Sequence, residues 1–317
     1  MSLQDLQQAY KFARGVSRGV RRGEVFPAAG RVPPAPAPGG SRVLRPARHG
    51  WNELGGWETT EHVVPVRGLT EPLRILHLSD VHLRGPEPWV DDLLAELSSI
   101  AAENPPDLVV LTGDVVTRGF QIEVAHRFLA GLPPGRLGTY AIIGNWEYWG
   151  LTPDPRSPHD PGYLGNQQDQ KQKRRTEWQA VLSAHGIPLL HNRSLRVGPI
   201  RLAGTDDCLA GDPDVAAAYA ELDGTPTLTL THSPALFPEL GHPDVFAVLA
   251  GHTHAGQVRF PFAGPFFLPK GSGAFPWGWY RHPRGTWLFV HRGIGWSVAP
   301  IRWRAPPEIA LVVLRPG

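Results

Sequence analysis

The chain has 317 residues, of which 41% are hydrophobic, and a formal net charge of +2. This is enough apolar material for one large domain or two small ones. The single cysteine, Cys208, excludes an internal disulfide framework, an all-thiolate zinc site and an iron–sulfur cluster. No stretch approaches the roughly 18 apolar residues of a membrane-spanning helix, and the N-terminus lacks the apolar core of a signal peptide.

The first 50 residues differ in composition from the rest of the chain. They hold nine Lys or Arg residues against two acidic ones, which leaves a net charge of −5 on residues 51–317. A mildly acidic body argues against nucleic acid as a partner. On a helix, residues 3–22 place apolar side chains on one side and basic side chains on the other, as in helices that lie on anionic membranes. The alternative interpretations are a helix packed on its own domain and a frayed leader, since Gly15 and Gly19 weaken a free helix.

These features predict a two-part organisation. Residues 1–50 are expected to form a basic amphipathic leader and a Pro-rich linker, and residues 51–317 a single domain. Residues 1–22 are the candidate contact with an anionic membrane surface. The expected location is therefore cytoplasmic, with peripheral binding at the inner face of the membrane as an option.

Beyond residue 51, apolar runs of strand length alternate with segments of helical spacing. The predicted strands cover 73–79, 107–112, 139–144, parts of 188–204, 225–231, 245–250, and regions near 286–291 and 308–314. The predicted helices cover 89–103, 122–132, 176–185 and 213–222. Residues 151–175 are polar and rich in Pro and Gly, which predicts a long loop near the site. The alternation of strands and helices predicts an α/β fold with extensive sheet.

Residues 259–280 place many aromatic side chains among Gly and Pro. If they are exposed, they form an apolar patch for membrane or lipid contact. If they are buried, they are ordinary core beneath a long hairpin, which is the interpretation that we favour.

Several of the apolar strands stop at polar residues of a particular kind. Their ends carry, in chain order, Asp80 and His82, Asp114, Asn145, His232, and His252 and His254. In open α/β sheets, ligands bind beyond the carboxyl ends of the strands, so these side chains are expected to converge on one rim. The i, i+2 spacing of the first and last pairs places both side chains on the same side if the backbone there is extended.

Together these residues offer two carboxylates, four imidazoles and one carboxamide, and no thiolate. This mixture suits Mn, Fe, Zn or Co better than Mg or Ca, which prefer oxygen ligands only. The set is too large for one tetrahedral ion, and a carboxylate can bridge two. It therefore predicts a pair of divalent ions that hold a hydroxide and clamp a phosphoryl group. Each motif alone is as readily a turn or a helix cap, and only their joint occurrence indicates a metal site.

The patterns D-x-H, G-D, G-N-x-E, H-S and G-H-T-H-x-G-Q-V-R, in this order, resemble the calcineurin-like metallophosphoesterase superfamily over roughly residues 60–317. GHTHAGQVRFP, RGIG (292–295) and PPEIALVVL (306–314) are similar to its bacterial single-domain branch, which includes phosphodiesterases and pyrophosphatases of UDP-linked lipid A precursors. The resemblance implies a four-layer αββα sandwich of mixed sheets with flanking helices. It also implies that one ion is bound by Asp80, His82, Asp114 and His254, and the second by Asp114, Asn145, His232 and His252. Asp114 is then the bridge.

The sequence departs from the family pattern at two linked positions. The family usually reads G-N-H-[DE], and that His is held to protonate the leaving oxygen, whereas here Trp146 follows Asn145. The family also often reads G-D-x-x-D, whose second Asp orients the same His, and here Thr117 takes its place. We therefore expect a centre that keeps its ions and has abandoned this proton donor. The resemblance also matches Arg118 to an arginine that contacts phosphate in some relatives.

The predicted function is hydrolysis of phosphodiester or pyrophosphate bonds through a metal-held hydroxide, with Mn favoured over Fe, Zn or Co. General-acid help is worth about 10²–10⁴-fold, and least for a good leaving group. A phosphorylated small-molecule or lipid substrate with such a group is expected, and Glu147, Tyr148 or a metal-bound water are other proton sources. Trp146 either stacks on a base or sugar of the substrate or fills the space of the lost histidine. The competing function is a non-catalytic metal-binding module that recognises a phosphorylated ligand or partner.

Overall fold

The computed structural model describes residues 25–27, 34–47, 56–117, 120–150, 168–261, 264–265, 267–297 and 300–317. The predicted amphipathic helix in residues 1–22, most of the predicted 151–175 loop, and Arg118 lie outside the described residues. Within the described part, no helix is both long and apolar enough to cross a bilayer.

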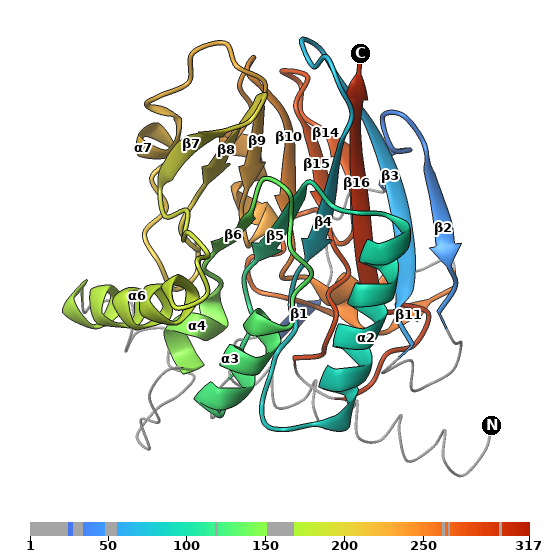
Figure 1. Cartoon of the computed structure of the whole chain (residues 1–317), viewed down its shortest axis with the longest axis vertical. Helices are drawn as coiled ribbons and strands as arrows, with labels where there is room; N and C mark the ends of the chain where they lie inside the picture. The colour runs from blue at the N-terminus through green and yellow to red at the C-terminus, as the bar shows by residue number, and fades with distance from the viewer. Residues whose placement is uncertain are drawn as a thin grey trace.

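Two six-stranded mixed sheets form the centre of the protein (Figure 1). The first has the order β2 (Ser41–Arg45), β3 (Glu58–Val66), β16 (Glu308–Pro316), β4 (Leu73–Leu78), β5 (Leu108–Thr112), β6 (Thr139–Ile142). The second has the order β14 (Gly278–Arg281), β15 (Trp287–Val290), β10 (Val245–Ala250), β9 (Thr227–Leu230), β8 (Ile200–Gly204), β7 (Arg193–Val197). Strands β4, β5 and β6 run parallel, as do β8, β9, β10 and β15, and both sheets also contain antiparallel pairs.

Small pairs and helices complete the structure. Two short antiparallel pairs join β1 (Val25–Pro27) to β13 (Phe267–Pro269) and β11 (Arg259–Phe260) to β12 (Gly264–Pro265). The helices are α2 (Pro88–Glu103), α3 (Ile122–Ala130), α4 (Asn145–Gly150), α6 (Gln168–Ser183) and α7 (Val215–Tyr219). Two 3₁₀ turns, η1 (Pro234–Glu239) and η2 (His254–Gly256), follow β9 and β10.

The buried side chains show how these elements are layered. Alternate residues of β5 enter different cores: Val109 and Leu111 pack with α2, α3 and α6, whereas Leu108 and Val110 pack with the second sheet. This alternation follows from the two-residue period of a strand buried on both faces. On its outer face, the second sheet packs against η1, with α7 beside it. The layers are thus helices, sheet, sheet and helices, and the predicted four-layer αββα sandwich is confirmed.

Three segments can be compared with what the sequence led us to expect: residues 41–45, the start of helix α6, and the aromatic segment 259–280. Residues 41–45, expected in the linker, form edge strand β2, where Arg42 pairs with Glu61 of β3, so these residues belong to the domain. Helix α6 begins at Gln168 rather than near 176, because Lys171 is buried and binds the carboxylate of Asp212. Among the described aromatic residues of the 259–280 segment, Trp279 and Tyr280 are buried, Phe267, Phe275 and Trp277 are half-buried, and Phe260 is exposed, so this segment is only partly core.

Candidate metal centre

The polar residues predicted from the sequence lie together where five parallel strands end. Asp80 follows β4, Asp114 follows β5 and Asn145 opens α4 just after β6, while His232 follows β9 and His252 follows β10. Their side chains are at most 4% exposed. The site is therefore built from the facing carboxyl ends of both sheets.

The backbone at this site is strained. Asp80, His82, Asp114, His252 and His254 all have positive φ angles, between 51° and 73°. Such angles are uncommon for residues with a side chain, and they persist mainly where function requires them. The backbone at the two i, i+2 pairs is therefore not extended, so the condition under which their spacing would place both side chains on one side is not met. Left-handed turns bring these side chains together instead.

Glycines before the ligand candidates allow the strand ends to approach closely. A Cβ atom on Gly251 would lie 1.9 Å from the Ser79 hydroxyl, and one on Gly144 would lie 2.4 Å from Asp114 Oδ1. Both distances are far below van der Waals contact. The glycines of the G-N and G-H motifs are thus steric requirements of this centre.

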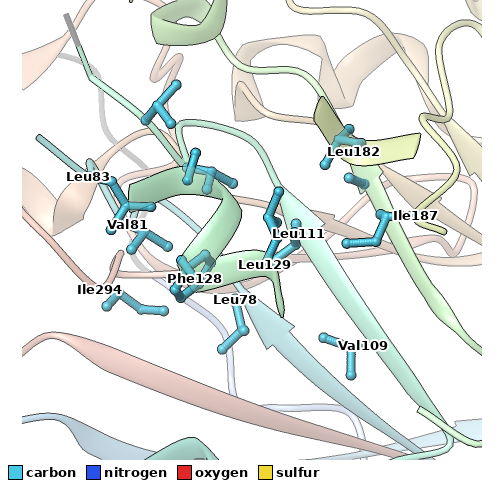
Figure 2. Packing of buried hydrophobic residues seen from close by; sticks show 14 of the residues in the cluster. Leu78, Val81, Leu83, Val109, Leu111, Phe128, Leu129, Leu182, Ile187 and Ile294 are labelled. Carbon is cyan, nitrogen blue, oxygen red and sulfur yellow. The ribbon is translucent and has the colours of Figure 1, made fainter. Parts of the chain in front are cut away.

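Apolar residues anchor the loop that carries Asp80 and His82. Val81 and Leu83, which alternate with them, are fully buried and belong to the core that includes Leu78 and Phe128 (Figure 2). Leu83 also forms an isolated parallel bridge with Val116. One side of the loop therefore packs into the core, while the polar side chains face the second sheet.

The first group of candidate ligands comprises Asp80, His82 and His254. The Nε2 atoms of the two histidines lie 2.9 Å apart, and His254 Nε2 lies 3.4 Å from Asp80 Oδ1. The Asp80 carboxylate also accepts hydrogen bonds from the Ser79 hydroxyl (2.6 Å) and the backbone N–H of His252. His82 Nδ1 has no partner among the described residues, although it is buried.

The second group comprises Asp114, His232 and His252, with Asn145 beside them. His232 Nδ1 lies 2.7 Å from the Thr112 carbonyl, and His252 Nε2 lies 2.6 Å from the Lys270 carbonyl. A carbonyl can only accept, so each of these nitrogens must carry the ring proton. The other nitrogen of each neutral ring therefore presents a lone pair.

These lone pairs point at further acceptors. His232 Nε2 lies 3.1 Å from Asp114 Oδ2, 3.2 Å from Asn145 Oδ1 and 3.2 Å from His252 Nδ1. Four acceptors at such separations repel one another unless a positive charge lies among them. The donor set, O and N atoms without thiolate, fits a divalent transition-metal ion. The two groups thus fit two such ions.

The pKa values of Asp80, Asp114 and His232 also indicate that the site stabilises positive charge. Burial raises the pKa of the Asp114 carboxyl to about 8 and also raises the pKa of Asp80. Burial acts to lower the pKa of His232, but the negative charge of Asp114 outweighs it, so this pKa lies well above its usual value. The surroundings of His232 therefore stabilise positive charge.

The two groups are in contact through Asp114. His82 Nε2 lies 3.8 Å from Asp114 Oδ2, the oxygen that also faces His232. The other oxygen, Oδ1, accepts the backbone N–H of Trp146 at 2.8 Å. Asp114 is therefore placed between the groups, as the role of a bridging ligand requires.

Neither Glu147 nor Tyr148 has a hydroxyl or carboxyl available as a proton donor. The fully buried Glu147 carboxylate accepts the backbone N–H groups of Gly144, Asp114, Val115 and Val116, at 2.6–3.3 Å. The Tyr148 hydroxyl donates to Asp206 at 2.8 Å, and burial raises its pKa. Glu147 fixes the two ligand-bearing turns, and Tyr148 fixes α4 against the 206–212 loop.

Trp146 lies at the rim of the first group. Its ring meets that of His82 edge-to-face, with centroids 5.9 Å apart, and meets Trp149 in the same way at 5.4 Å. Trp146 is partly exposed, whereas Thr117 is buried. Trp146 thus lies beside His82 with part of its ring exposed, where it can contact a substrate.

Sequence reasoning missed the groups that hold the ligands. Arg302 is fully buried, donates to the carbonyls of Gly295, Arg292 and Ala305, and places Nη2 3.0 Å from His254 Nδ1. The backbone carbonyls of Thr112 and Lys270 orient two histidines. Ser79, whose hydroxyl donates to Asp80, is the exception, because it is itself part of the S-D-V-H motif.

This geometry defines two adjoining clusters of candidate ligands for metal ions, and comparison with known proteins identifies the family. The profile of the calcineurin-like phosphoesterases matches residues 73–256. The chain belongs to this family, which implies a metal-dependent phosphoric ester hydrolase.

Two relatives and one solved structure illustrate the similarity. The uncharacterized metallophosphoesterase YkuE of Bacillus subtilis is 29% identical over 269 residues, covering 81% of this chain and 85% of that protein. A transmembrane protein with metallophosphoesterase domain from Danio rerio is 31% identical over 275 residues, covering 80% of this chain and 56% of that protein. A solved dimetal phosphatase from Danio rerio has 10% identity and a TM-score of 0.38, covering 71% of this chain and 88% of that one. That score is too low to support an argument.

Proposed function

We propose that this protein hydrolyses phosphodiester or pyrophosphate bonds with two divalent ions. Asp80, His82, Asp114 and His254 would hold one ion, and Asp114, Asn145, His232 and His252 the other. The observation that carries the proposal is the convergence of Asp114 Oδ2, Asn145 Oδ1 and His252 Nδ1 on His232 Nε2, in an environment that stabilises positive charge and so raises the pKa of His232. When bound, two such ions polarise phosphoryl oxygens and lower the pKa of bound water toward about 7.

Manganese is the ion that we propose first, with Fe, Zn and Co as alternatives. Four imidazoles favour a transition metal, and two carboxylates with one carboxamide favour the harder members of that series. The absence of a thiolate from the ligand set makes zinc less favoured than it would be in a cysteine site.

The substrate that we propose is a nucleotide- or lipid-linked phosphate compound with a good leaving group. The indole N–H of Trp146 is too weak an acid to protonate a leaving oxygen, and the carboxylate of Glu147 is fully engaged by backbone N–H groups. General-acid catalysis matters most for a basic alkoxide and least for a phosphate or phenolate. A centre without an acid therefore favours pyrophosphate linkages and activated diesters.

The first experiment measures hydrolysis of bis(4-nitrophenyl) phosphate and 4-nitrophenyl phosphate with each ion added or chelated. We expect activity that requires metal and falls at least about 10³-fold in Asp114→Asn, because this carboxylate faces both groups. Asp169→Asn, on the exposed surface of α6, is the matched control and should retain full activity.

The competing function, a non-catalytic metal-binding module for a phosphorylated ligand, is favoured by the loss of the acid dyad at Trp146 and Thr117. The same experiment separates the two. A protein that binds metal and phosphate but hydrolyses neither ester with any of the four ions would be such a module.

The second experiment restores the acid dyad. Trp146→His combined with Thr117→Asp should raise kcat for an alkyl phosphodiester by about 10²-fold or more, and should change kcat for the aryl diester little. The single variants control for the new groups separately, and thermal unfolding checks that a carboxylate is tolerated at the buried position of Thr117. Equal effects on both esters would contradict the leaving-group argument.

A further inference from the structure

Arg84 lies beside the candidate metal centre but outside its ligand set. It follows His82 by two residues, so their Cα atoms are at most about 7 Å apart. The segment against which Arg84 packs is tied to the same loop: Ile294 N–H donates to the Ser79 carbonyl at 3.0 Å, and Gly295 N–H to the Asp80 carbonyl at 2.8 Å. Trp296 and Ser297 follow directly. Arg84 and this segment therefore form the rim of the first group.

The guanidinium is fixed in place by two contacts. Its central carbon lies 4.8 Å from the centroid of the Trp296 ring, and Nη2 donates to the Ser297 carbonyl at 3.3 Å. Trp296 is itself supported by Trp89, whose centroid lies 5.9 Å away and whose indole N–H bonds to Glu87. Such packing restricts the long side chain and preorganises it for a ligand.

Arg84 is partly buried, yet within the described residues its guanidinium forms no ion pair. The one hydrogen bond to Ser297 leaves most of its N–H donors unused. An unpaired cation of this kind suits an anion that arrives with the substrate.

The ligand set contains two carboxylates, Asp80 and Asp114, so two divalent ions leave the loaded centre positively charged and able to hold the reacting phosphoryl group. Arg84 adds a second positive centre beside it. A phosphodiester carries one negative charge, whereas a substrate with a pyrophosphate linkage carries a second on the neighbouring phosphate.

We propose that Arg84 is a specificity-determining residue that binds the phosphate next to the one under attack, and so favours pyrophosphate-linked substrates over simple diesters. This inference rests on the function proposed above. If Arg84 served only to cover Trp296, its replacement would change the two substrate classes equally or not at all.

The test compares kcat/KM for diadenosine diphosphate and bis(4-nitrophenyl) phosphate in the Mn²⁺-loaded protein. Arg84→Gln should lower kcat/KM for the diphosphate by about 10- to 100-fold, mainly through KM, and alter that for the diester less than about threefold. Arg281→Gln is the matched control, because Arg281 also lies over a tryptophan, Trp287, at 5.3 Å, but at the opposite ends of the strands.

Binding supplies a readout that does not depend on turnover. Calorimetry with the methylene-bridged analogue of diadenosine diphosphate should show about tenfold or greater weakening in Arg84→Gln, with unchanged metal content and with wild-type affinity in Arg281→Gln. Equal losses for both substrates, or unchanged analogue binding, would overturn the role of Arg84. Absence of wild-type hydrolysis would instead count against the proposed function, and the calorimetric comparison would still decide whether Arg84 binds the second phosphate.

Discussion

The two groups of the metal centre contain similar side chains but differ in what holds their histidines. In the second group, His232 and His252 each donate a ring N–H to a backbone carbonyl, of Thr112 and Lys270 respectively. In the first group, the outer nitrogen of His82 has no partner among the described residues, and that of His254 faces the guanidinium of Arg302.

This difference determines which nitrogen is ready to bind a metal. A carbonyl partner fixes the ring orientation and leaves the opposite nitrogen unprotonated, which strengthens it as a ligand. Arg302 is a donor, so a neutral His254 must accept at Nδ1 and carry its proton on Nε2, the nitrogen that faces Asp80 and His82. Metal binding at the first group must therefore move a proton or rearrange this contact. His232 of the second group must also release a proton, because its pKa is raised, but its ring and that of His252 are already oriented by carbonyls. We infer that the rings of the second group are preorganised and those of the first are not.

The largest effect of this asymmetry should appear in metal affinity. We expect Mn²⁺ to bind the metal-free protein in two steps whose dissociation constants differ by about 10- to 100-fold, because second-shell partners of ligating histidines contribute that much. His252→Gln should abolish the tighter step, and His82→Gln the weaker one. Isothermal titration calorimetry resolves the steps, and metal analysis after gel filtration counts the ions that remain.

The number of binding steps, and which variant loses the tighter one, tests whether the carbonyl partners set the order of metal binding. A single step of two equal ions, or loss of the tighter step in His82→Gln, would show that the carbonyl partners do not set the order. The control is His126→Gln, which removes the imidazole of a partly exposed histidine of α3 and should leave both binding steps intact.

Much of the fold could be predicted because its central strands are apolar on both faces. The apolar runs 107–112 and 245–250 agree within one residue with the bounds of strands β5 and β10. The missed strands β2 and β3 are rich in charged and polar residues: Arg42 and Glu61 pair at the sheet edge, and β3 is buried despite its polar sequence. Helix α6 was placed too late because the contact of Lys171 with Asp212, which is 41 residues away, leaves no periodic signal.

The ligand candidates could be found because they are side chains at strand ends with characteristic spacings. The groups that contact and orient the ligand histidines could not be found in this way. The carbonyls of Thr112 and Lys270 are groups that every residue has, and Arg302 lies 48 residues from the histidine that it contacts. The sequence therefore predicted which residues meet, while the difference between the two groups depends on tertiary structure.

A network behind the second group extends the comparison. The side-chain oxygen of Thr112, whose carbonyl holds His232, lies 2.8 Å from His77 Nε2. His77 packs on His291 with centroids 4.8 Å apart, and both rings are fully buried. Burial lowers the pKa of His77 well below its usual value and that of His291 to about 4, although the charge of Glu308 opposes both shifts. The second group thus rests on imidazoles that must stay neutral.

The smallest predicted effect follows from this requirement. Unfolded His291 takes up a proton below about pH 6.5, but folded His291 only near pH 4, so its contribution to stability is complete above pH 6.5 and is lost as the pH falls toward 4. Between pH 7 and pH 5 this single group should lower the free energy of unfolding by about 2 kcal/mol. Urea unfolding of the metal-free protein measures it, and His291→Gln should be less sensitive to acid by that amount, whereas Arg315→Gln at the exposed end of β16 should behave as wild type. If His291→Gln and wild type lose stability in parallel, His291 is already protonated in the fold, and the neutral support of the second group must be sought in His77 alone.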